Sequence, residues 1–225
     1  MCGRFAQKTD VRKLAKQFGV SEAPPAEARY NVAPTQAVLC VREDGDGREM
    51  TFMIWGLVPS WAKDPSMGAR LINARSETVA EKPSFREAFK RRRCIVPADG
   101  FYEWMRQGGK KRPFFFRMKD NAPFGFAGLW DRWEGEDRQA LNSCTILTTE
   151  ANEVVRPVHG RMPVILSPAD YALWLEEDAR KGDLLAELLR PYPASEMTSH
   201  PVSPAVNNPR SQGAELIERA PLNSA

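Results

Sequence analysis

Residues 37–55 read AVLCVREDGDGREMTFMIW, and this stretch indicates the class of fold. It contains two mainly apolar runs, 37–42 and 49–55, with the Gly/Asp segment 44–47 between them. Apolar runs of this length on either side of a glycine-containing turn are typical of a β-hairpin. We therefore expect two antiparallel strands here, joined by a short turn.

Further strand candidates follow along the chain. Each is a short apolar run bounded by Gly, Pro, Asn or Asp, as strands of antiparallel sheets usually are. They are 94–97, 113–118, 124–130, 143–148 and 163–166.

Fewer segments show helical spacing of apolar residues with a cap or a stop signal. They are 11–18, with Thr9 as its cap and Gly19 at its end; a short helix after a capping box of Ser84 and Glu87; 167–174, opened by Ser167 and Pro168; and 183–190, stopped by Pro191.

Strands outnumber helices and rarely alternate with them, which favours an α+β fold over repeated βαβ units. We predict a single domain over residues 1–217, with a mostly antiparallel, barrel-like β-sheet and flanking helices. Residues 218–225 show little periodicity and are expected to form a flexible tail.

The composition is that of a globular chain with one substantial core. Of the 225 residues 42% are hydrophobic, and no run of 18 uncharged apolar residues occurs. Near the start, Arg4, Lys8 and Arg12 stand where a secretory signal needs a continuous apolar segment. We therefore expect a cytoplasmic protein that does not associate with membranes.

Three cysteines, Cys40, Cys94 and Cys144, lie inside apolar runs, and the chain has no C-x-x-C pair. We expect them to be reduced and packed in the core. The two histidines, His159 and His200, are far in sequence from any cysteine pair at zinc-like spacing. We expect no metal site and no other cofactor.

The net charge of +3 is unevenly distributed. Residues 63–119 contain 15 Lys and Arg against 6 Asp and Glu, a net charge of +9, whereas residues 120–190 contain 7 against 13, a net charge of −6. A basic region of this size suits binding of a polyanion. Charge alone leaves a solvated basic surface as an equal alternative.

The start of the chain carries the most distinctive chemistry. If Met1 is removed, as aminopeptidases do when the next side chain is small, Cys2 presents an α-amine and a thiol on neighbouring carbons. An α-amine has a pKa of about 7.7–8.0, so roughly a tenth of it is uncharged at neutral pH. The amine condenses with an aldehyde, and the thiol then closes a thiazolidine ring. The expected partner is an aldehyde, although a lone Cys2 could equally be a buried thiol.

Other polar residues lie at expected turns and strand ends, where functional sites usually assemble. The guanidinium fork suits phosphates, amides offer hydrogen bonds, and aromatic rings among cations suit unstacked bases. The residues concerned are Arg4, Asn31, Pro34, Trp61, Asn73, Arg75 and Arg161. Taken singly, each has a structural alternative: the turn 31–35 could be a plain turn, Trp61 could pack in the core, and Arg75 could pair with Glu77.

Two further side chains suit proton transfer. Glu103 lies among aromatic residues, and burial there would raise its pKa towards neutrality; its alternative is a salt bridge to one of the arginines at 91–93. His159 suits proton transfer at cellular pH. His200 is its competitor, because sequence spacing does not show which histidine would pair with a cysteine.

Together these segments resemble the SOS-response-associated peptidase family. The similarity covers nearly the whole chain, from Cys2 to the segments 207–209 and 213–216, in the order that family shows. The motifs that carry it are MCGRF at 1–5, NVAP at 31–34, WGLVPSW at 55–61, INARSE at 72–77, PADGFYEW at 97–104 and HGRMP at 159–163.

The resemblance implies a protein that senses abasic sites in single-stranded DNA and forms a covalent thiazolidine crosslink through Cys2 once Met1 is removed, which shields the site from strand cleavage. Asn73 would orient the cysteine and the opened sugar, Glu103 would move protons, and His159 would assist ring opening and crosslink reversal. Gly160 departs from the polar or acidic neighbour expected beside His159. The DNA-binding residues implied are Arg4, Asn31, Pro34, Trp61, Arg75 and Arg161.

The resemblance also implies a peptidase (hydrolase) activity that removes Met1 autocatalytically and a lyase-type activity. One compact domain favours a monomer, and we expect a bacterial-type protein that associates with the nucleoid when bound to DNA. Whether a partner recruits it to replication forks stays open. Two other interpretations also stay open. One is a thiol peptidase that acts on other proteins, with Asn73 as oxyanion donor. The other is a noncovalent nucleic-acid-binding module in which Cys2 is incidental.

Overall fold

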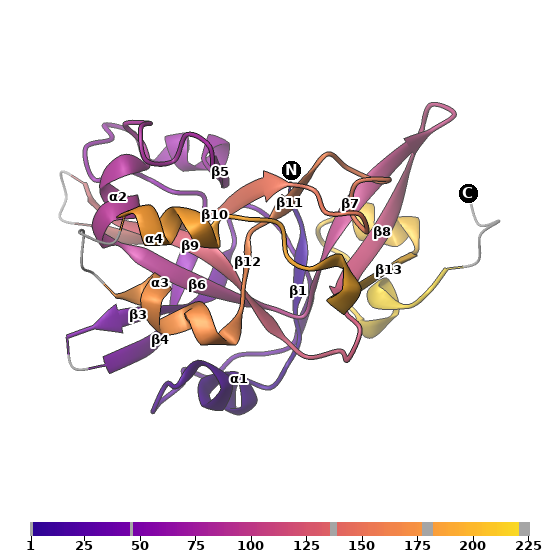
Figure 1. The fold of residues 1–225 in the computed structure, drawn as a ribbon, viewed down its shortest axis with the longest axis horizontal. Coiled ribbons are helices and arrows are strands. Elements are labelled where there is room, and N and C mark those ends of the chain that lie inside the picture. Colours follow the sequence, from indigo (N-terminus) through magenta and orange to yellow (C-terminus); the bar gives the residue numbers. More distant parts are fainter. Residues whose placement is uncertain (1, 46, 136–138, 177–181, 221–225) are drawn as a thin grey trace.

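The predicted hairpin is the first part of a strand-rich fold (Figure 1). A computed structural model describes residues 2–45, 47–135, 139–176 and 182–220. In it, β3 (Ala37–Asp44) pairs antiparallel with β4 (Gly47–Trp55) along their whole length. Residues 38–41 are all buried, which explains why this strand is a continuous apolar run rather than an alternating pattern.

Five strands close into a barrel. After β3 and β4, the ring continues through β10 (Ala140–Glu150), β9 (Phe124–Glu134) and β6 (Arg93–Ala98), and β6 pairs back with β3. The junction of β4 with β10 is parallel and the other four are antiparallel, so the barrel is mixed. Closure leaves these strands with few free edges.

A second, five-stranded antiparallel sheet lies beside the barrel. Its order is β13 (Met197–Pro201), β8 (Lys110–Met118), β7 (Gly100–Gln107), β1 (Phe5–Gln7) and β2 (Arg29–Val32). Three short strands extend the barrel sheet: β5 (Asn73–Arg75) and β11 (Arg161–Pro163) pair with β10, and β12 (Ile165–Leu166) pairs with β9. In Figure 1 the β7–β8 hairpin projects away from the body of the molecule.

The helices lie outside the barrel (Figure 1). They are α1 (Val11–Phe18), α2 (Arg86–Arg91), α3 (Tyr171–Leu175) and α4 (Gly182–Leu188), with 3₁₀ turns η1 (Pro65–Arg70), η2 (Pro168–Asp170), η4 (Ala194–Glu196), η5 (Pro204–Asn207) and η6 (Ala214–Ile217). Phe18, Phe89 and Trp174 from these helices belong to one core cluster with barrel residues. A second cluster contains Cys40, Cys94 and Cys144, which are buried and free as predicted.

The α+β class and the mostly antiparallel, barrel-like architecture are therefore confirmed, but two helix caps were wrong. Asp10, not Thr9, caps α1, because the Thr9 hydroxyl donates to the buried Asp99 carboxylate instead. The capping box of Ser84 does not form, because α2 begins at Arg86 and no side chain caps it.

Sequence patterns missed β1, β2, β5, β7 and β13. Four of them have only three to five residues, too few to show a period. Of the predicted tail, residues 218–220 are described, and the Ala220 N–H donates to the Pro201 carbonyl at 2.9 Å; residues 221–225 lie outside the described part. Among the described helices, none has the length and apolar character needed to cross a membrane.

Candidate active site

Cys2 lies where the barrel and the five-stranded sheet meet. The segment before β1 continues alongside β7, since the Tyr102 N–H donates to the Arg4 carbonyl at 2.9 Å. From the barrel side, Asn73 at the start of β5 donates its side-chain amide to the Cys2 carbonyl at 2.8 Å. Cys2 has no solvent exposure, and its burial, together with the charge of Glu103, raises the pKa of its thiol. The cysteine is thus fixed in place and its thiol is protonated at neutral pH.

Glu103 comes from the middle of β7 and is only 3% exposed. Burial raises the pKa of its carboxyl group, and the nearby His159 opposes that rise. Glu103 Oε1 lies 4.0 Å from His159 Nδ1. A carboxyl group in this setting is suited to both giving and taking a proton near neutrality.

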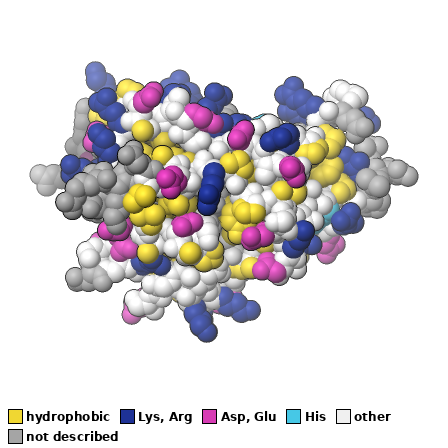
Figure 2. Space-filling view, viewed as in Figure 1, with side chains coloured by type: hydrophobic (Ala, Val, Ile, Leu, Met, Phe, Trp, Pro, Cys, Tyr) yellow, Lys and Arg dark blue, Asp and Glu magenta, His cyan; other side chains and the backbone are white. Residues whose placement is uncertain are grey.

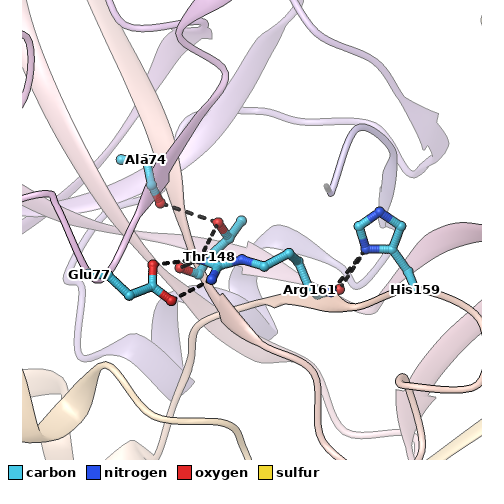
Figure 3. A network of polar contacts seen from close by, with 5 residues as sticks. All are labelled: Ala74, Glu77, Thr148, His159 and Arg161. Carbon is cyan, nitrogen blue, oxygen red and sulfur yellow. Dashed lines mark hydrogen bonds and ion pairs between the residues drawn. The ribbon is translucent and has the colours of Figure 1, made fainter.

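His159 is oriented by the backbone of Arg161 (Figure 3). The Arg161 N–H donates to His159 Nδ1 at 3.0 Å, and the Arg161 carbonyl lies 3.1 Å from the same nitrogen. Nδ1 can accept from this N–H or donate to this carbonyl, according to the tautomer of the ring. Because the Arg161 backbone orients the His159 ring, a polar or acidic side chain at position 160, where this chain has Gly160, is not needed for that.

The Arg161 side chain points away from His159 (Figure 3). Its guanidinium pairs with Glu77 and donates to the Thr148 carbonyl at 2.6 Å. The contact lowers the pKa of the Glu77 carboxyl. The sequence left a pair of Arg75 with Glu77 as an alternative. Glu77 pairs with Arg161 instead, since β5 and β11 both pair with the same end of β10.

Arg4 and Asn31 form a second polar cluster, which joins the start of the chain to its C-terminal segment. Arg4 Nη1 donates to Asn31 Oδ1 at 2.7 Å and to the Val206 carbonyl at 2.8 Å. Asn31 is fully buried, and its amide donates to the carbonyls of Asn208 and Ser211, each at 3.0 Å. These contacts hold the backbone on either side of β1 and β2.

The other predicted binding residues lie nearer the surface. Trp61 is 58% exposed, Arg75 is exposed at the end of β5, and Pro34 is half-buried in a turn. Trp55, in contrast, is buried in the core, and its indole N–H donates to the Ile72 carbonyl.

Two alternatives from the sequence are resolved by these positions. His200 lies on β13, where its Nε2 contacts the Ile217 carbonyl at 2.8 Å and its ring packs against Phe115, so it is His159 that accompanies Glu103. Of the arginines proposed as partners for Glu103, Arg92 pairs with Asp131 at 3.2 Å and Arg93 donates to backbone carbonyls.

A pocket of about 470 Å³ opens beside Glu103 and His159. Its other lining residues are Trp104, Arg106, Lys111 and Asn207, of which Arg106 and Lys111 were not singled out from the sequence. The QGGK turn at 107–110 was the available signal, since a Gly-Gly turn between strands predicts a hairpin that continues β7. Within the described ranges, no three His, Cys, Asp or Glu side chains are grouped as a metal site would require.

The fold and the site define a class of single-domain protein. It has a closed mixed barrel with an attached antiparallel sheet, and a buried cysteine at residue 2 lies where the two meet. A family model described as SOS response associated peptidase (SRAP) matches residues 1–209. The chain belongs to this family, as its motifs predicted.

Individual relatives agree over nearly the full length. The chain is 42% identical to Abasic site processing protein YoqW of Bacillus subtilis, covering 97% of this chain and 99% of the relative. It is 34% identical to Abasic site processing protein YedK of Escherichia coli, covering 97% and 99%. A crystal structure of a protein from Bacteroides thetaiotaomicron superposes with a TM-score of 0.88 at 26% identity, covering 97% and 100%.

Proposed function

We propose that this protein processes abasic sites in single-stranded DNA by forming a thiazolidine crosslink at Cys2 after Met1 is removed. The observation that carries the proposal is the grouping around one cysteine. The Asn73 amide donates to the Cys2 carbonyl, and the charge of Glu103 raises the pKa of the Cys2 thiol. His159 adds a second proton-transfer group next to Glu103. The names of the YoqW and YedK relatives support the same substrate.

The covalent steps balance without an external reagent. The α-amine of Cys2 adds to the C1′ aldehyde of the ring-opened deoxyribose to give a carbinolamine, which loses water to form an imine. Cys2 Sγ then bonds to C1′, and the thiol proton ends on the ring nitrogen. One water leaves and the phosphodiester backbone stays intact, so the strand is protected from cleavage. The reverse sequence releases the protein.

The surrounding side chains supply the proton transfers. Because burial keeps the Cys2 thiol protonated, Sγ needs a base, and the Glu103 carboxylate is the group close to it. Glu103 in its acid form donates to the departing hydroxyl of the carbinolamine. His159 assists opening of the sugar ring through its imidazole, which the Arg161 backbone orients.

Surface residues of the same region would hold the strand. Arg75 is exposed for a phosphate contact and Trp61 for stacking with an unpaired base. Arg161 would reach a phosphate by sharing the nitrogens that now contact Glu77 and Thr148, whereas Arg4 bonds Asn31 and Val206 through Nη1. We further propose that the protein acts as a cytoplasmic monomer, that it removes Met1 itself, and that its lyase-type activity is the reversal step.

The decisive experiment mixes the purified protein with a single-stranded oligonucleotide whose uracil has been excised. Intact-mass measurement should show loss of Met1 and an adduct that survives boiling in detergent, and Cys2→Ala should abolish it. His159→Gln should slow adduct formation by about 10²-fold, whereas His200→Gln, away from the site, should not change it. Turnover of peptides without any adduct would instead indicate a thiol peptidase, and equal DNA retention by wild type and Cys2→Ala without an adduct would indicate a noncovalent module.

A further inference from the structure

The β7–β8 hairpin extends directly from the active site. Arg106 follows Glu103 by three residues on β7, which places it about 10 Å further along the strand. The turn residues Gly108 and Gly109 both have positive φ, as a tight hairpin turn requires. Figure 1 shows the hairpin projecting from the body, and Figure 2 shows Lys and Arg side chains gathered beside its tip.

The pairing of this hairpin brings like charges together. Arg106 lies directly opposite Lys111, with Lys110 next in register, and all three side chains are exposed. Like charges directly opposite each other destabilise an antiparallel pair. The sequence offers no relief nearby, because residues 104–119 contain no Asp or Glu. In the part of the chain that the structure describes, no carboxylate forms an ion pair with Arg106, Lys110 or Lys111.

The same cations line the pocket of the proton-transfer groups. Arg106 and Lys111 share the cavity of about 470 Å³ with Glu103 and His159. A strand whose damaged sugar reaches Cys2 would therefore pass its neighbouring phosphates along these two side chains. A polyanion is the ligand that would remove the repulsion between them.

We propose that the β7–β8 hairpin is a phosphate clamp for one flank of the DNA strand captured at Cys2; this rests on the proposed function. Arg106 and Lys111 contact the backbone on a single side of the abasic sugar, since the hairpin leaves the site in one direction only. Capture therefore depends on the length of one flank more than on the other, and it does not depend on base sequence there.

The test compares wild type with Arg106→Gln/Lys111→Gln. A matched control, Lys13→Gln/Lys16→Gln, removes two exposed charges from α1, on the opposite side of the molecule in Figure 1. Three abasic oligonucleotides are used: one with long flanks on both sides, and two in which one flank is cut to a single nucleotide. The rate of adduct formation is read on denaturing gels at several salt concentrations.

Wild type and the control should lose rate when one particular flank is cut. The hairpin variant should be slow on the long substrate and should not slow further when that flank is cut. Its slope of log rate against log salt should fall by about 1.4, at roughly 0.7 for each phosphate contact on a single strand. The melting temperature should stay equal or rise, because the variant removes the repulsion between β7 and β8.

Two results would overturn the clamp. One is a hairpin variant that matches wild type on all three substrates, and the other is a variant that slows equally whichever flank is present. If wild type forms an adduct in these cases, the proposed function stands and only the clamp fails. If wild type forms no adduct with any substrate, the proposed function fails and the clamp with it.

Discussion

At the scale of single residues, Glu103 couples stability to pH. Its carboxyl pKa is raised by burial in the folded protein, whereas in the unfolded chain it is near the ordinary value of about 4.3. A raised pKa stabilises the fold below the unfolded value, and this stabilisation is lost as pH rises through the folded value. Burial of Glu103 therefore makes the fold less stable at neutral pH than at acid pH.

Glu103→Gln should separate stability from chemistry. The amide has no charge to bury, so the melting temperature should rise relative to wild type at pH 7, and the gain should shrink to nothing as pH falls below about 4. Adduct formation should drop by about 10²–10⁴-fold because the proton-transfer group is lost. Thermal unfolding between pH 3 and 8 and the gel assay measure both effects, and a variant with unchanged adduct rate would exclude the role given to Glu103.

Local sequence predicted some site residues and could not predict what surrounds them. Cys2, Asn73, Glu103 and His159 each belong to a short motif, and the structure places them around one point. The buried contacts of Asn31 with Asn208 and Ser211 join residues about 180 apart in the chain. No local pattern encodes such a pair, so these buried contacts of Asn31 could not be predicted from the sequence.

At the scale of elements, β7 and β8 can approach closely because Gly100 has no side chain. A Cβ added there would lie 2.6 Å from the Phe116 carbonyl oxygen and 2.2 Å from the Phe115 ring. Gly100→Ala should therefore destabilise the protein by about 1–3 kcal/mol. Gly160→Ala is the matched control, since no atom lies within 4 Å of its added Cβ, and its effect should stay within about 0.5 kcal/mol. Urea unfolding of both variants checks this, and equal stabilities would contradict it.

The strands that the sequence predicted are long enough for their own residues to show an apolar run. β3, β4, β9 and β10 have eight to eleven residues and long apolar runs. β1 and β5 have three residues each and are ordered by their neighbours, β7 and β10. The cap of α1 is Asp10 rather than Thr9 for the same reason, because the Thr9 hydroxyl is held by Asp99, about 90 residues away.

At the scale of the whole molecule, the Lys and Arg side chains of the basic segment 63–119 differ in exposure and in their partners more than the net charge implied. Arg93 is buried and donates to the carbonyls of Phe89, Lys90 and Trp174, and Arg92 pairs with Asp131. The cations of the β7–β8 hairpin remain exposed. Counting charges along the chain could not separate these two groups, because burial is decided by the barrel and not by the segment.

The link between Arg4, Asn31 and the Val206 carbonyl also has a consequence for how the protein is made. A ribosome delivers Cys2 early, yet the Val206 carbonyl that secures the adjoining Arg4 is synthesised 202 residues after that arginine. The surroundings of the first residues are therefore completed only near the end of translation, and a nascent chain stalled before residue 206 would hold its leading residues without this contact.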